Sequence, residues 1–462
     1  MNEKEIDDND ENVRLNDIDE KKVFEPKKKI SNQLLYFILL CVSILAVLIF
    51  FIILYFTLGD KSADVIKKNT FKAKYYIEAE TQVKLFASYL KHYIYSMKIN
   101  EKNIDSENID NVFTSNTGGE YLIEIALNES LSTTEDLFKE CSSLIDVDLS
   151  ELETKEINNM TEMFYQCTSL KTINLKNFKA PLSTNMSKMF YGCENLQSLD
   201  LSGFDTSKVL DMSNLFYSCY KIESINLNNL DSSKVEYMNN MFYSCTGLKT
   251  INFKNFKTNN IKNMKNMFFK CYSLESVDLS SFDTSQVTNM ESMFSYDKYI
   301  KNLNLENFDT SKVTDMSNMF SACTNMISIN INFNTQEVVD MNNLFKGCQN
   351  LKSINLKSFK TENVKQMGMM FYDCLNLTSL DISNFNTPKA ENMGGIFGRC
   401  LKLNYIDITN FSSSGLKANA NLFNEIGENG TIIFNSKNFN QSLIDVNDIK
   451  SWTKKDVSKN GK

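Results

Sequence analysis

The sequence predicts an α/β solenoid of stacked strand-turn-helix coils, preceded by one transmembrane helix and a helical stalk. Three observations predict this class. A cysteine recurs at a spacing of 26 residues over most of the 462-residue chain, and a run of 25 residues near the N-terminus contains no charge. Between these two regions, apolar residues recur at helical steps. Self-similarity with a period of 20 to 50 residues is typical of solenoids, whose units bury their apolar sides against their neighbours.

The N-terminal region predicts a tail followed by a membrane anchor. Residues 1–33 mix acidic residues with lysines and contain few apolar residues, so we expect a disordered cytoplasmic tail. Residues 34–58 read LLYFILLCVSILAVLIFFIILYFTL. About 20 apolar residues cross a bilayer as a helix, and this run is too long and bulky for a cleavable signal peptide. We therefore predict a transmembrane signal anchor; the alternative is a buried hydrophobic hairpin of a soluble protein.

The charges on either side of the anchor bear on its orientation. Lys27, Lys28 and Lys29 lie closest to the span, although Lys61 and Lys67 follow it. Positive charges favour the cytoplasmic side. We expect a single-pass protein of the cell membrane with the N-terminus in the cytoplasm and the C-terminal repeat domain outside.

Residues 59–118 are interpreted as a stalk helix and a linker. The helix is predicted over 76–97, because apolar residues there recur at steps of mostly three and four. These residues are Tyr76, Val83, Phe86, Leu90, Tyr93, Ile94 and Met97. The helix forms a stalk or packs on the solenoid; a dimerising coiled coil is the alternative, but the pattern covers barely three heptads. A polar linker follows over 100–119.

Residues 144–426 form the predicted solenoid. One unit, Leu196 to Cys219, reads LQSLDLSGFDTSKVLDMSNLFYSC. Its LxxLxL start is the leucine-rich-repeat pattern and predicts a strand, and Val209, Met212, Leu215 and Phe216 then recur at helical steps. The FDTS between them offers side-chain oxygens to the first amides of the helix. The fold class is therefore a leucine-rich-repeat-like, right-handed stack of coils.

Eleven strand starts follow from this pattern, and caps are expected at both ends of the stack. We expect an N-terminal cap over 119–143 and a C-terminal cap and tail over 427–462, the latter with Ile432, Phe434 and Trp452. The strand starts are Leu144, Leu170, Leu196, Ile222, Leu248, Leu274, Ile300, Met326, Leu351, Leu377 and Leu403.

With these motifs, LDLSGFDTSKVLDMSNLFYSC and NLENFDTSKVTDMSNMFSAC, the chain resembles the BspA-like leucine-rich-repeat surface proteins, in particular the mycoplasma-type repeat of about 26 residues. The resemblance covers 144–423. It implies display at a cell surface and attachment to host or neighbouring cells, and it carries no catalytic residues.

The composition argues against an enzyme and against nucleic-acid binding. His92 is the sole histidine, and the formal net charge is −8. The chain has no nucleophile motif and no Gly-rich phosphate loop. We therefore predict no catalytic residue, no metal and no cofactor, and no nucleic-acid partner.

The cysteine and methionine columns are interpreted as core. No two repeat cysteines have the close spacing of a zinc site, and parallel side chains rarely reach the torsion of a disulfide. We predict buried free thiols, although an extracellular cysteine usually pairs. A reversed topology, with the repeats in a reducing cytosol, is the alternative. Thioethers can bind copper(I), but the methionines lie on the apolar side and are predicted to pack there.

The candidate binding residues lie on the strands, at the two positions that point away from the core. One position is Asn or Asp and the other is mostly Ser or Thr. We predict that this ladder binds a partner; the alternative is that the stacked side chains bond to one another. The residues are Asp200, Asn226, Asn252, Asp278, Asn304, Asn330, Asn355, Asp381, Ser198, Ser224, Thr250 and Ser276.

The functional prediction is a membrane-anchored surface protein whose repeat domain mediates macromolecular binding or cell adhesion. Its expected partners are the membrane and a protein or glycan ligand on another cell or host surface. The alternative is a structural surface-coat protein whose coils self-associate. Solenoids present broad surfaces for both roles.

Overall fold

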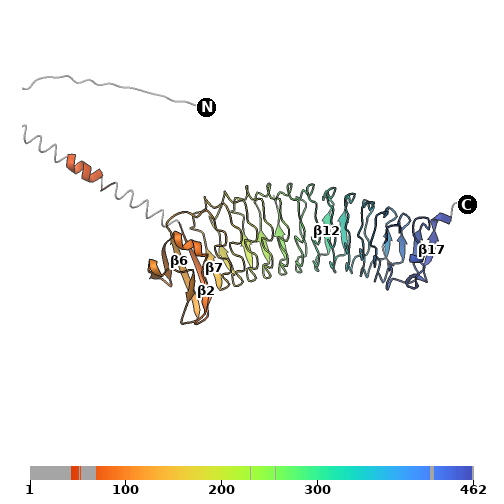
Figure 1. Cartoon of the computed structure of the whole chain (residues 1–462), viewed down its shortest axis with the longest axis horizontal. Helices are drawn as coiled ribbons and strands as arrows, with labels where there is room; N and C mark the ends of the chain where they lie inside the picture. The colour runs from red at the N-terminus through yellow and green to blue at the C-terminus, as the bar shows by residue number, and fades with distance from the viewer. Residues whose placement is uncertain are drawn as a thin grey trace, which may run out of the picture. The chain divides into compact units, whose positions relative to one another are not determined.

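The computed structural model describes residues 43–50, 52–53, 69–228, 230–254, 256–416 and 421–459 (Figure 1). The chain divides into two compact units, 1–63 and 64–462. The expected tail over 1–33 and most of the expected anchor over 34–58 lie outside the described residues. Residues 43–50 and 52–53 are helical. No described helix is long and apolar enough to cross a membrane.

Residues 69–127 form a β-sheet domain, so the predicted stalk helix over 76–97 is wrong. Phe71, Ala73, Tyr75 and Ile77 alternate along the first strand and are each at most 2% exposed, whereas Tyr76 is 54% exposed. This period of two defines a strand with one buried face. The elements are β1 (Thr70–Ile77), β2 (Gln82–Lys84), the 3₁₀ helix η1 (Ser88–Tyr93), β3 (Ile94–Ile99), β4 (Lys102–Ile104), the 3₁₀ helix η2 (Ser106–Asn108), β5 (Val112–Thr114) and β6 (Gly119–Leu127).

The N-terminal sheet continues into the repeats without a break. Its strand order is β4-β3-β6-β1-β7-β8, where β7 (Leu144–Asp148) and β8 (Thr172–Asn174) belong to the first coils. Strand β1 pairs antiparallel with β7, and β7 pairs parallel with β8. The β-sheet domain thus covers the open end of the stack through backbone hydrogen bonds, as solenoids require of their terminal units.

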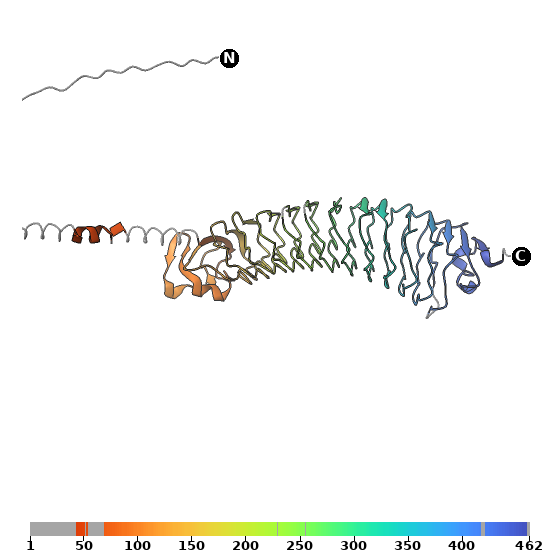
Figure 2. The same cartoon turned by 90° about the horizontal axis from the view of Figure 1, so that it is seen from above.

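Beyond β8 the coils stack in a single row in both views (Figures 1 and 2). The strands pair parallel and in register, so that Ser224 faces Ser198 and Thr250. Strands are absent from the described segments after two of the predicted starts, Leu274 and Leu351. The strands present are β9 (Ser198–Asp200), β10 (Ser224–Asn226), β11 (Thr250–Asn252), β12 (Asn302–Leu305), β13 (Ser328–Ile331), β14 (Ser379–Asp381) and β15 (Tyr405–Asp407).

The predicted helix of each coil is also wrong, because this part of the coil is a series of turns. Met212, Asn214, Phe216 and Ser218 donate their backbone N–H groups to carbonyls of the next coil at 2.8–3.0 Å. Asn214 and Ser218 have φ of 57° and 58°, in the left-handed region that a right-handed helix cannot include. Equivalent isolated parallel bridges connect the coils from Asn159 to Asn392. The architecture is therefore a β-solenoid of about twelve turns.

The core consists of columns of identical side chains. Phenylalanine rings stack from Phe138 to Phe423 with centroids 5.3–6.3 Å apart. The predicted methionine columns are buried beside them. The ten described cysteines are free and buried, as predicted. Their thiols also act as donors: the Cys219 Sγ lies 3.1 Å from the Phe190 carbonyl oxygen.

The FDTS motif starts a turn rather than a helix. The Asp283 Oδ1 accepts the backbone N–H of Ser285 at 3.0 Å, which is the bond type predicted for a helix start. The Thr284 side chain is buried and donates to the carbonyl oxygen of Asp309 in the next coil at 2.9 Å. Buried hydroxyls at this position therefore join consecutive coils.

Residues 427–459 extend the stack at its C-terminal end. The parallel sheet runs β14-β15-β16-β17, with β16 (Thr431–Phe434) and β17 (Thr453–Asp456). Ile432, Phe434 and Trp452 are buried, and the indole N–H of Trp452 donates to the Gly427 carbonyl at 2.6 Å. Three 3₁₀ helices complete this end: η3 (Gln441–Leu443), η4 (Asn447–Ile449) and η5 (Val457–Lys459).

Candidate functional site

The twelve predicted binding residues lie on one face of the coils, which we call the strand face. It consists of a Ser/Thr column and an Asn/Asp column on either side of a buried Leu or Ile. In β9, for example, Leu199 is buried while Ser198 and Asp200 are exposed. Of the twelve residues, Asn226 is half-buried and the others are exposed. The predicted outward orientation is thus confirmed, whereas the predicted binding role stays a prediction.

Two of the hollows on this face are together lined by ten of the twelve predicted residues. One, of about 500 Å³, is lined by both columns of β9, β10 and β11. The other, of about 570 Å³, is lined by Ser276 and Asp278 and by residues of β12 and β13, including Asn304 and Asn330. Asn355 and Asp381 line neither hollow.

The Asn/Asp column has a structural task. In almost every coil its Oδ1 accepts the backbone N–H of the residue two positions later, which turns the chain at the end of the strand. Asn and Asp make this bond more strongly than Ser or Thr, which accounts for the restriction of the column to these two residue types. The acceptor-to-donor pairs are Asp200–Ser202, Asn226–Asn228, Asn252–Lys254, Asp278–Ser280, Asn304–Glu306, Asn355–Lys357 and Asp381–Ser383, at 2.9–3.3 Å.

The same hydrogen bonds also lower the pKa of two Asp carboxyls in the column. Hydrogen bonds from Ser280 hold the pKa of the Asp278 carboxyl below its usual value, and those from Ser383 do the same for Asp381. Both carboxylates are therefore ionised at neutral pH. Asn330 is an exception, because its Oδ1 accepts no backbone N–H from the described residues; its Nδ2 donates to Glu306 Oε2 at 3.0 Å, and the Nδ2 of Asn226 likewise donates to Asp200 Oδ1 at 3.1 Å. This coil carries the single 25-residue step of the repeat.

The Ser/Thr column is the part of the face with free hydrogen-bonding capacity. Within the described residues, the hydroxyls of Ser198, Ser224, Thr250 and Ser276 bond to no other group. In a later coil, Ser328 differs and donates to Asn302 Oδ1 at 2.8 Å. Exposed hydroxyls can both donate and accept, so this column can bond a polar ligand without losing an internal contact.

Sequence reasoning missed a second surface, the aromatic column, formed by Tyr165, Tyr191, Tyr217, Tyr243 and Phe269. Their rings stack at 4.4–4.8 Å and are half-buried. Burial and the neighbouring tyrosines raise the pKa of Tyr217. The signal was present in the sequence, because each ring directly follows a phenylalanine of the core column. Such a stripe supplies the aromatic anchors that the strand face lacks.

Within the described part of the chain, no group of three or more His, Cys, Asp or Glu side chains is placed to hold a metal ion. His92 lies in η1, outside the repeats.

Comparisons with known proteins identify the repeat. The family model described as "Mycoplasma protein of unknown function, DUF285" matches residues 132–251, 236–331 and 327–433, which together span 132–433. The predicted resemblance to the mycoplasma-type repeat is thereby confirmed. No curated protein matches the sequence.

Among solved structures, a leucine-rich cell surface protein from Faecalibacterium prausnitzii A2-165 is 17% identical, with a TM-score of 0.23, over 50% of this chain and 79% of that chain. A TLR13–ssRNA13 complex is 13% identical, with a TM-score of 0.19, over 67% of this chain and 59% of that chain.

Proposed function

The chain belongs to the family "Mycoplasma protein of unknown function, DUF285", and we propose that its solenoid is a binding module displayed at a cell surface. In this proposal, residues 34–58 anchor the protein in the membrane, the N-terminus is cytoplasmic and the repeats are outside. The partner is a protein or glycan on another cell or host surface. The contact is made by the strand face.

One observation supports the strand face above all. Three consecutive coils present free, exposed hydroxyls in register, those of Ser198, Ser224 and Thr250, and the exposed hydroxyl of Ser276 follows in the next coil; these residues line the two hollows. Neighbouring strands in a sheet are about 4.8 Å apart, so the same donor and acceptor recur at a fixed short interval. An extended partner with regularly spaced polar groups fits this surface.

The experiment uses the full chain in detergent micelles, probed with a protein and glycan array and with whole cells. In the test variant, Ser198, Ser224, Thr250 and Ser276 are all changed to alanine. Each lost hydrogen bond is worth about 0.5–1.5 kcal/mol, so binding should weaken at least tenfold. The Asn/Asp column is left intact, because its loss would disturb the turns.

The matched control changes Thr288 and Thr314 to alanine. Both are exposed, but they lie outside the strand face and donate to backbone carbonyls of the preceding coil. Binding should be unchanged in this variant. Equal binding by the test variant and the unmodified chain would refute the strand face as the site, and ordered self-assembly without binding would favour a surface coat.

The membrane orientation needs its own measurement. Protease treatment of intact cells should remove the repeats and spare the N-terminal tail. Repeats that survive while the tail is cut would show the reverse topology.

A further inference from the structure

The aromatic column stops after Phe269 and leaves a gap before an aromatic residue returns. The equivalent positions of the next coils hold Ser295, Ser321 and Lys346, and Tyr372 follows in the fourth coil. The rings before the gap stack at 4.4–4.8 Å. The backbone bridges between coils continue through the gap, so the gap removes rings from the surface without interrupting the stack.

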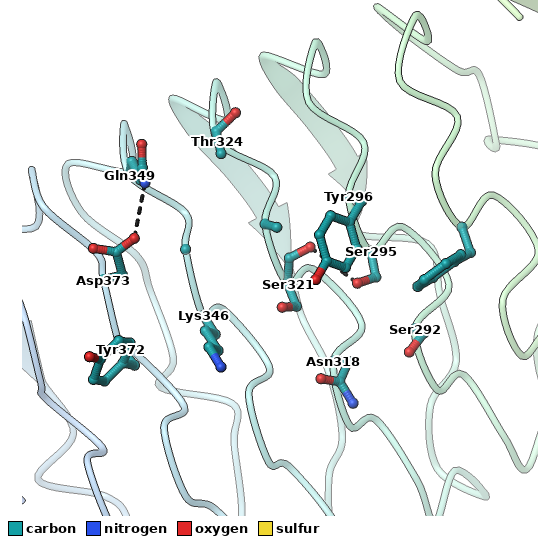
Figure 3. A pocket seen from close by; sticks show the side chains of 13 residues that line it. Ser292, Ser295, Tyr296, Asn318, Ser321, Thr324, Lys346, Gln349, Tyr372 and Asp373 are labelled. Atoms are coloured by element: carbon teal, nitrogen blue, oxygen red, sulfur yellow. Dashed lines mark hydrogen bonds between the residues drawn. The ribbon is translucent and has the colours of Figure 1, made fainter. Parts of the chain in front are cut away.

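A hollow of about 430 Å³ occupies this gap (Figure 3). Phe269 and Tyr296 line one end of the hollow, and Tyr372 lines the other. Ser295 and Ser321 line it between these ends; their side chains are buried, and Ser295 Oγ donates to the Ser321 carbonyl at 3.2 Å. Figure 3 shows the Tyr296 ring beside these two serines, with Lys346 between it and Tyr372.

Lys346 and Asp373 are the two charged residues that line the hollow. Lys346 is half-buried, and its Nζ lies 5.8 Å from the centre of the Tyr372 ring and 3.6 Å from Met369 Sδ. No carboxylate in the described part of the chain forms an ion pair with Lys346. The one carboxylate lining the hollow, Asp373, accepts from Gln349 Nε2 at 2.9 Å and pairs with Arg399 at 3.1 Å.

A second lysine, Lys270, lies beside the rings of Phe269 and Tyr296 at the other end of the hollow. The Nζ of Lys270 lies 5.2 Å from the ring of Phe269 and 5.8 Å from that of Tyr296. Each of these contacts is a cation–π interaction between the ammonium group and the ring that it covers. A positive charge therefore lines the hollow near Tyr372, and a second one, which does not line it, lies over the Phe269 and Tyr296 rings.

We propose that this hollow binds a planar aromatic ring that carries an anionic group. The ring stacks in the gap of the column, on Tyr296 or Tyr372, and the anion approaches Lys346. Aromatic rings gain about 0.5–1.5 kcal/mol from such pairing beyond their buried area. The Ser321 hydroxyl makes no bond to another described residue and is free for a polar substituent on the ring.

This site is separate from the proposed function on the strand face. It shares no lining residue with the two hollows there. The same ligand chemistry can come from a free aromatic acid or from a C-terminal tyrosine of a peptide, and the test has one arm for each source.

The test measures binding of 4-hydroxyphenylacetate and of the peptide Gly-Gly-Tyr to the full chain in detergent, by saturation-transfer NMR and calorimetry. Cyclohexylacetate has the same charge but no aromatic ring and should bind at least fivefold more weakly. Binding of the acid but not the peptide identifies a small-molecule site, and binding of the peptide at least as tightly as the acid identifies a peptide site.

Three variants assign the binding to the hollow. Lys346→Met should weaken binding at least fivefold. Its matched control is Lys298→Met, because Lys298 also lies over a tyrosine, with its Nζ 4.7 Å from the Tyr272 ring, but does not line the hollow. Ser321→Tyr restores the ring found in other coils and should abolish binding.

The proposal fails if neither probe binds, if cyclohexylacetate binds as tightly as the aromatic acid, or if Lys346→Met and Lys298→Met behave alike. A Ser321→Tyr variant that unfolds leaves the Lys346 comparison as the deciding result. Array binding through the strand face is measured separately, so either proposal can fail without the other.

Discussion

At the scale of single residues, Asp297 is the exception in the cysteine column. Its side chain is fully buried, and Oδ1 accepts the backbone N–H of Cys271 at 2.9 Å, while Oδ2 has no partner. Burial raises the pKa of this carboxyl well above its usual range. The neutral form retains a proton, as the thiols at this position of the other coils do, and avoids a buried charge.

This residue makes stability depend on pH. Because the folded pKa is raised, the folded state keeps a proton that the unfolded state releases above about pH 4. The stability from the neutral carboxyl is complete below that pH and is lost as the pH rises through the folded pKa. Asp297→Asn and Asp297→Cys should therefore gain stability over the unmodified chain between pH 4 and pH 8.

The gain should be about 1.4 kcal/mol for each unit of pH below the folded pKa, as measured by urea unfolding at several pH values. Thr288→Ala, at an exposed position without a titratable group, serves as the control and should show no such trend. A difference between the variants and the unmodified chain that is constant with pH would contradict a neutral buried carboxyl.

At the scale of elements, the turns of each coil depend on residues in the left-handed region. In the coil that ends at Cys323, Asn318 and Ala322 have φ of 58° and 60°. Non-glycine residues there cost roughly 1–2 kcal/mol. In two other coils the residue at the position of Ala322 is a glycine, which adopts a positive φ without this cost: Gly192 and Gly347 have φ of 70° and 73°.

Ala322→Gly therefore distinguishes turns from a helix. In a left-handed turn the change should stabilise the protein by roughly 0.5–1 kcal/mol, whereas in a helix it would destabilise it by about the same amount. Chemical unfolding measures the sign. Ala390→Gly is the control, since Ala390 is buried and not in the left-handed region, and it should be destabilising.

At the scale of the whole molecule, each coil is held mainly by its two neighbours. Backbone bonds, the phenylalanine column and the buried threonine hydroxyls all run from one coil to the next. Stability is then approximately a sum of coil and neighbour terms. The end coils differ, because β1 pairs antiparallel with β7 to close the N-terminal end.

Deleting one full coil, residues 196–221, should preserve the fold. The deletion joins Asn195 to Ile222, which is the start of the next unit. Unfolding by urea should remain cooperative with a slightly smaller slope, because less surface is exposed. Deleting residues 196–208 instead places the turn segment that begins at Val209 where a strand is required, and it should abolish folding. Similar behaviour of the two deletions would contradict a stack in which each segment pairs in register with its equivalent in the next coil.

Much of the fold was predictable from the sequence. The 26-residue period located the coils, and the LxxLxL pattern assigned the strand and its outward residues. The buried thiols and methionines followed from the same period. In the site, the two polar columns were found, but the turn-forming task of Asp200 and its equivalents was not, because it depends on a backbone N–H two residues away.

Two features became known only from the tertiary structure: the coils contain turns in place of the predicted helices, and the aromatic column has a gap. Met212, Leu215, Phe216 and Cys219 have helical spacing, yet their segment is a turn series whose N–H groups bond to the next coil. Spacing reports which side chains are buried and not where the backbone amides find their partners. The sequence by itself thus determined the period and the buried face, and the stacking of coils decided the backbone conformation and the hollow at Ser295 and Ser321.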